Sequence, residues 1–147
     1  MYRKILVSLD GSKMSECALE HVRAIATGSN VTKVDLLFVA EPVSPGLYQS
    51  SEESKEKLMT WGKDYLAKIE RSLLNDGVKA KSIILEGRPA ETIVDYAEKN
   101  NIDVIIMSTH GRSGISRWAF GSVAGKVIST STVPVLIAVP KGCRISV

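Results

Sequence analysis

Apolar residues gather in five short runs along the chain, and longer segments with a helical repeat separate these runs. Several of the runs are apolar at consecutive positions, as expected for strands that are buried on both faces of a parallel sheet. The segments between them repeat apolar residues every three to four positions, which is typical of helices that cover a sheet. The expected strands are residues 5–9, 34–40, 82–85, 104–107 and 135–139.

Turn and capping residues delimit four expected helices. The first follows the turn at residues 10–12 and ends at Gly28. The third begins at Pro89, because proline is accepted in the first turn of a helix, and the fourth follows Ser122, whose hydroxyl is expected to cap it. The second turns an apolar face inward and ends at Gly77. Its apolar positions are Leu58, Trp61, Tyr65, Ile69 and Leu73.

The alternation of strand and helix predicts a doubly wound, Rossmann-like α/β fold. It has a five-stranded parallel sheet in the order 3-2-1-4-5, with helices on both faces. The length favours a single domain over residues 1–147. In this order the winding reverses between the first and fourth strands, so a ligand site is expected beyond their carboxyl ends, where Asp10 and residues 108–111 lie. The Pro- and Ser-containing segment 41–54 is expected to be a loop on the same side.

A glycine-containing segment, residues 108–122, lies between the fourth strand and the fourth helix. Backbone N–H groups of such a loop, together with the positive end of a helix dipole, favour a bound anion such as phosphate. The glycines could also belong to a connector that only needs positive φ, and their spacing alone does not separate the two interpretations. Residues 10–12 could likewise form only a turn and a helix cap, a role that is compatible with a binding site.

Charge and composition narrow the class of partner. The chain carries 19 Lys and Arg against 16 Asp and Glu, a formal net charge of +3, without a basic block, so no nucleic-acid partner is expected. No stretch approaches the roughly 20 apolar residues of a membrane span, and no secretory signal is recognisable, so we expect a cytoplasmic protein without a membrane partner. Cys17 and Cys143 lack the spacing of a metal site or of a disulfide framework.

The sequence resembles the universal stress protein family, in its nucleotide-binding subgroup, over nearly the whole chain. The resemblance is carried by residues 4–12, 87–89, 108–122 and 133–137. The family's ATP signature is a glycine, two residues, a glycine, nine residues, and a glycine followed by serine or threonine. Gly111, Gly121 and Ser122 match it, whereas Ser108 stands at the first glycine position.

The resemblance implies an adenine nucleotide α-hydrolase-like fold and a site for ATP, or for AMP or another adenine nucleotide. Mg²⁺ or Mn²⁺ would be carried by the nucleotide, and no protein ligand to a metal is expected. Ser8, Leu9 and Asp10 would lie against the ribose and adenine, with Val39 beside the base. The other expected nucleotide-binding residues are Ser108, His110, Gly111, Arg112, Gly114, Gly121, Ser122 and Val123.

We expect a binding protein with a regulatory role in the stress response, and no catalytic residue. His110 has no carboxylate nearby in sequence, and Ser113 lacks the surroundings of a hydrolase nucleophile, so at most slow ATP hydrolysis or autophosphorylation is expected. A nucleotide-free interaction module is an alternative, and Ser108 is the feature that favours it. Nucleotidylyl transferases would need a signature histidine pair that is missing after the first strand.

The last expected strand is apolar throughout, although the strand order places it at an edge of the sheet. Exposed edges of this kind favour pairing with another chain. The resemblance implies a homodimer through residues 135–139, which begin with Val135 and end with Val139. The role of the tail after Pro140 stays open.

Overall fold

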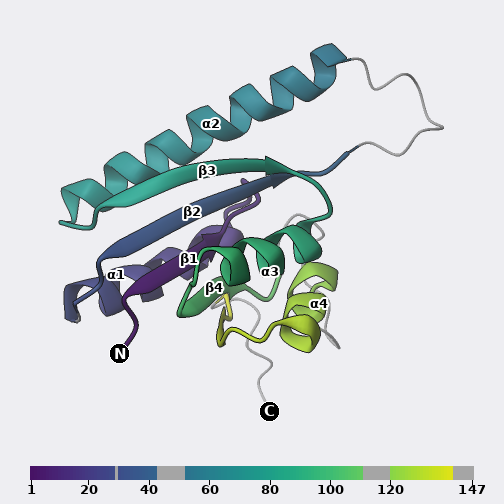
Figure 1. Ribbon diagram of the computed structural model, residues 1–147. Coiled ribbons are helices and arrows are strands. Elements are labelled where there is room, and N and C mark those ends of the chain that lie inside the picture. Colours follow the sequence, from purple (N-terminus) through teal and green to yellow (C-terminus); the bar gives the residue numbers. More distant parts are fainter. Residues whose placement is uncertain (29, 43–51, 111–119, 141–147) are drawn as a thin grey trace.

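The computed structural model describes residues 1–28, 30–42, 52–110 and 120–140 (Figure 1). Five parallel strands form a sheet in the order β3-β2-β1-β4-β5. The strands are β1 (Lys4–Ser8), β2 (Lys33–Ala40), β3 (Ala80–Glu86), β4 (Val104–Ser108) and β5 (Val135–Ala138). The predicted α/β fold and its strand order are confirmed.

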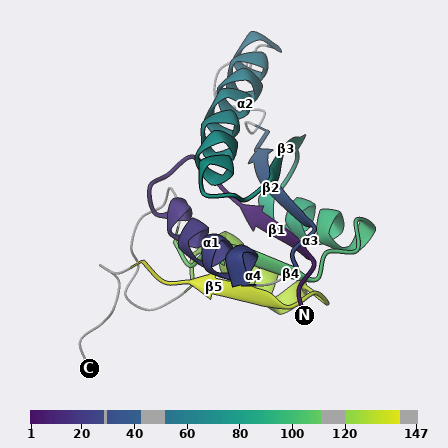
Figure 2. The ribbon, with the colours of Figure 1, turned by 90° about the vertical axis from the view of Figure 1, so that its left-hand side faces the viewer.

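Helices cover both faces of this sheet (Figures 1 and 2). They are α1 (Ala18–Gly28), α2 (Glu52–Asn75), α3 (Pro89–Lys99) and α4 (Ser122–Thr130). Side chains from α1 and α2 belong to one hydrophobic cluster, and those from α3 and α4 belong to the other. The two clusters place α1 and α2 on one face of the sheet and α3 and α4 on the opposite face.

The central strands alternate between these two clusters. In β1, Ile5 and Val7 contribute to the cluster under α1 and α2, whereas Leu6 contributes to the cluster under α3 and α4. In β4, Ile106 and Ile105 divide in the same way. Because both faces are buried, nearly every position of such a strand is apolar, which explains the almost continuous apolar runs in the sequence.

The ends of several helices differ from the expectation. A short 3₁₀ turn, Ser15–Cys17, precedes α1. Helix α2 already begins at Glu52, so the expected loop 41–54 was too long; acidic residues in the first turn of α2 complement the helix dipole. Ser122 does not cap α4, because Gly121 is the N-cap residue and Ser122 is the first helical residue.

Two edge strands and one aromatic residue also differ from the sequence predictions. Strand β3 is longer than expected, and β5 ends at Ala138 instead of Val139. Trp61 was placed on the buried face of α2, but 48% of its surface is exposed. Within the described part of the chain, no helix has the length and apolar character that crossing a membrane requires.

Candidate functional site

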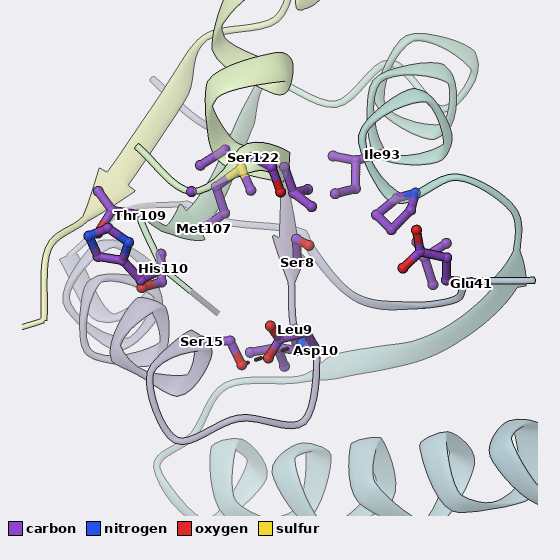
Figure 3. A pocket seen from close by; sticks show the side chains of 16 residues that line it. Ser8, Leu9, Asp10, Ser15, Glu41, Ile93, Met107, Thr109, His110 and Ser122 are labelled. Carbon is purple, nitrogen blue, oxygen red and sulfur yellow. Dashed lines mark hydrogen bonds between the residues drawn. The ribbon is translucent and has the colours of Figure 1, made fainter. Parts of the chain in front are cut away.

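A cavity of about 240 Å³ opens where the winding of the sheet reverses, at the carboxyl ends of β1 and β4 (Figure 3). Every predicted nucleotide-binding residue that the structure describes lines this cavity: Ser8, Leu9, Asp10, Val39, Ser108, His110, Gly121, Ser122 and Val123. Gly111, Arg112 and Gly114 lie outside the described residues. Segments that are far apart in the sequence therefore meet at one place, as the strand order predicts.

The turn after β1 holds Asp10 through a network of short-range hydrogen bonds. The backbone N–H of Ser12 donates to Asp10 Oδ1 at 2.9 Å, and the N–H of Asp10 donates to Ser15 Oγ at 3.3 Å. Ser15 Oγ donates in turn to the carbonyl oxygen of Ser12 at 2.8 Å. Asp10 therefore takes part in the turn and also lines the cavity, and its carboxylate is held at the cavity wall.

Part of the cavity wall is apolar. Ile93, Met107 and Ala124 are almost completely buried there, and Val39 is partly buried. Figure 3 shows Ile93 and Glu41 at one end of the cavity, Thr109 and His110 at the other end, and Ser8, Asp10 and Ser122 between them. The apolar part of the wall is suited to an uncharged ring.

The N-terminus of α4 opens on the cavity through Ser122 and Val123. The backbone N–H of Gly121 donates to the carbonyl oxygen of Thr109 at 2.7 Å, which joins the helix start to the end of β4. A Cβ atom at Gly121 would lie 2.5 Å from that same oxygen, so the close approach requires glycine. The first N–H groups of a helix lack partners within the helix and favour a negative charge.

A second helix N-terminus lies at the same cavity. Pro89 is at the start of α3, and it also lines the cavity. The helix dipoles of α3 and α4 therefore both place their positive ends here.

The end of β4 carries three consecutive polar residues that are more than nine-tenths buried. Ser108, Thr109 and His110 are 7%, 5% and 7% exposed. Ser108 Oγ, Thr109 Oγ1 and His110 Nδ1 have no hydrogen-bond partner among the described residues. Buried polar groups are normally paired, so this strand end is where a polar partner is still required. His110 also has no described group that would orient it as a base.

Sequence reasoning missed part of the cavity wall. The missed lining residues are Ser15, Glu41, Pro89, Ile93, Met107, Thr109 and Ala124. Ile93 belongs to the hydrophobic cluster under α3 and α4, so its apolar character alone indicates a core residue, and Pro89 is predicted only as the start of a helix. The predicted strand order could have indicated Glu41, because Glu41 directly follows β2 and β2 lies next to β1.

The family model for the universal stress protein family matches residues 1–139. Universal stress protein MJ0577 of Methanocaldococcus jannaschii is 36% identical over 154 residues, covering 93% of this chain and 94% of the relative. A solved structure of MJ0577 superposes with a TM-score of 0.86 at 38% identity, covering 96% of this chain and 98% of the other.

Two more distant structures share the fold and were solved with nucleotides. A universal stress protein in complex with cAMP has a TM-score of 0.67 at 22% identity, covering 93% of this chain and 96% of the other. A family protein from Arabidopsis thaliana with AMP bound has a TM-score of 0.67 at 17% identity, covering 97% and 95%. Since the family model spans nearly the whole length and MJ0577 is similar over both chains, this chain belongs to the universal stress protein family.

Proposed function

We propose that this universal stress protein is a regulatory binder of an adenine nucleotide. ATP is the expected ligand, and Mg²⁺ or Mn²⁺ would arrive with the nucleotide. The observation that carries the proposal is the joining, in one cavity, of apolar lining residues, the carboxylate of Asp10 and two helix N-termini. Two relatives of the same fold were solved with cAMP and with AMP, which supports this class of ligand.

Each part of the cavity suits one part of such a ligand. The base would lie against the apolar lining residues Val39 and Ile93. The ribose hydroxyls would donate to Asp10, because a carboxylate only accepts hydrogen bonds. The phosphates would lie at Ser122, at the start of α4, where N–H groups and the helix dipole favour negative charge. Gly111, Arg112 and Gly114 stay predicted contacts to the phosphates.

Binding, and not turnover, is the activity that this site supports. Rapid phosphoryl transfer requires a group that positions or activates the nucleophile, and Nδ1 of His110 has no hydrogen-bond partner among the described residues that could orient the ring for this task. Slow hydrolysis or autophosphorylation is therefore the weaker alternative. A phosphate-release assay with purified protein would exclude it if release stayed at the level of buffer alone.

A homodimer through residues 135–139 completes the proposal. Strand β5 lies at an edge of the sheet, and its residues up to Ile137 are only partly buried in the single chain. Just beyond the strand, 47% of the surface of Val139 is exposed. An apolar edge strand of this kind is stabilised when a second copy covers it.

Calorimetric titration of nucleotide-stripped protein with Mg-ATP tests the proposed function. Gly121→Ala should lose saturable binding, because the added Cβ pushes on Thr109 at the start of α4. Gly125→Ala is the matched control in α4, since among the described residues its Cβ would meet only Phe120 Cβ, at 3.9 Å, and it should bind as the wild type does. Circular dichroism melting of both variants checks that they are folded.

Two results would contradict the proposal. If the wild type shows no saturable binding of ATP, AMP or cAMP, the nucleotide-free interaction module becomes the better interpretation. Ser108, at the first glycine position of the ATP signature, would then account for the loss of binding. If Gly121→Ala binds as tightly as Gly125→Ala, the nucleotide does not lie at the start of α4.

A further inference from the structure

The turn that carries Asp10 has two sides, and only one of them faces the cavity. Asp10 and Ser15 line the cavity. Gly11 lies between them and faces α2, the helix that passes below the turn in Figure 3. The residue proposed to hold the ribose is therefore fixed to a short segment whose back is covered by a different element.

Trp61 of α2 packs directly on Gly11. A Cβ atom at Gly11 would lie 2.3 Å from Trp61 Cη2 and 2.7 Å from Cζ3, so the indole occupies the space of a side chain. Gly11 also has a φ of +86°, a conformation that favours glycine. The conformation of the turn and the position of the indole therefore depend on each other.

Tyr65 ties the same indole to the far end of the turn. Its ring stacks on Trp61 with centroids 5.3 Å apart and planes 3° from parallel. Its hydroxyl donates to Glu16 Oε1 at 3.1 Å, in the 3₁₀ turn that contains Ser15. Burial and then the charge of Glu16 raise the pKa of Tyr65, and the charge of Asp10 adds to this rise, so the phenol stays protonated and able to donate.

We infer that the stacked pair Trp61 and Tyr65 positions Asp10 for its ligand from outside the cavity, and that ligand binding is in turn coupled to the exposed indole of α2. The inference rests on the proposed function, since it names a regulatory connection of the same site. Coupling between two sites is reciprocal. A change at Trp61 that alters nucleotide affinity therefore implies that the nucleotide alters the packing of Trp61.

The reciprocal direction has a direct optical test. The chain contains two tryptophans, so Trp118→Phe leaves Trp61 as the only indole. Saturating Mg-ATP should shift the emission of Trp61 and lower its quenching by acrylamide, because a fixed turn holds the indole more firmly. Unchanged emission and quenching while calorimetry shows ATP bound to the same protein would overturn the coupling.

The positioning role is tested by comparing ATP with 2′,3′-dideoxy-ATP, which lacks the hydroxyls that Asp10 would accept. Trp61→Leu and Tyr65→Phe should each raise the Kd for ATP about fivefold or more, and change the Kd for the dideoxy analogue little. Asp10→Asn should reduce the preference for ATP in the same way. Ile69→Ala is the matched control, because Ile69 also packs from α2 against the sheet core and should leave the preference unchanged.

The outcomes separate the inference from the proposed function. No ATP binding by the wild type contradicts the proposed function itself. Binding by the wild type, with equal weakening of both nucleotides in Trp61→Leu and Tyr65→Phe, shows a merely structural role and overturns the inference. An unchanged preference for ATP in both variants overturns it as well.

Discussion

The phenol of Tyr96 donates a hydrogen bond of 2.9 Å to Oδ2 of Asp35, a carboxylate that is completely buried in β2. Lys33 Nζ lies 2.8 Å from the same oxygen. Oδ1 is also buried and has no hydrogen-bond partner among the described residues. The link fixes the C-terminal part of α3 to the start of β2, at the opposite end of that strand from Glu41 and the cavity.

Tyr96→Phe should therefore destabilise the fold by about 2 kcal/mol, the scale of a hydrogen bond to a charged group. The ring and its packing are kept, so the loss comes from the buried carboxylate that is left with fewer donors. Urea unfolding at pH 7 measures the difference. The same substitution in an Asp35→Asn background should cost clearly less, and an equal cost in both backgrounds would contradict the role of the carboxylate.

The Tyr96 link should also depend on pH at the alkaline end. Burial, and then the hydrogen bond to Asp35, raise the pKa of Tyr96 above its ordinary value. Its contribution is therefore complete below about pH 10, the pKa of an unfolded tyrosine, and is lost as pH rises through the higher folded value. The difference between wild type and Tyr96→Phe should stay constant from pH 6 to 9 and shrink above pH 10.

Asp103 fixes the start of β1 to the start of β4. Its Oδ2 accepts the backbone N–H groups of Arg3 and Lys4, each at 2.8 Å, and these bonds lower its pKa. A lowered pKa stabilises the fold above the unfolded value of about 3.9, and this stabilisation is lost as pH falls through the folded value. Asp103→Asn should lower the melting temperature at pH 7, and the difference should close near pH 2. A difference that does not depend on pH would contradict this role of the charge.

The sheet could be predicted from the sequence because its signal is local. In β1 and β4 the apolar runs are nearly continuous, and this pattern is typical of parallel strands that are buried on both faces. The strand order followed from the alternation of elements and from the handedness of crossovers. Asp10 could be placed at the cavity for the same reason, since the carboxyl ends of β1 and β4 have to lie side by side.

Features that depend on contacts between distant segments could not be predicted in this way. The buried Asp35 depends on Tyr96, which lies in α3, and the sequence around Asp35 does not indicate this partner. Trp61 fits the apolar repeat of α2, but its indole also packs on Gly11 in the turn after β1 and leaves part of its surface exposed. Helix α4 begins one residue earlier than predicted, because the N–H of Gly121 donates to the carbonyl oxygen of Thr109.

Gly62→Ala should destabilise the protein although alanine is the better helix former. A Cβ at Gly62 would lie 2.6 Å from Phe38 Cδ1, and the Phe38 ring is buried. Overpacking of a core costs about 1–3 kcal/mol, which exceeds the gain of up to about 1 kcal/mol from helix propensity. Gly28→Ala is the control, because no atom of the described residues lies within 4 Å of its Cβ position, and it should melt at or above the wild-type temperature. A Gly62→Ala variant as stable as Gly28→Ala would show that the ring moves aside freely.

The proposed dimer can be tested at β5, which forms one edge of the sheet. Val139→Lys places a charge at the end of β5, and charges on an edge strand oppose pairing with a second chain. Leu74→Lys is the matched control, since 56% of the surface of Leu74 is exposed, but it lies at the end of α2 and away from β5. Light scattering coupled to size exclusion should give the wild type and Leu74→Lys twice the chain mass of 15.9 kDa, and Val139→Lys the single mass. A wild type that is monomeric at all concentrations would contradict the dimer but not the nucleotide site, because all described residues that line the cavity belong to one chain.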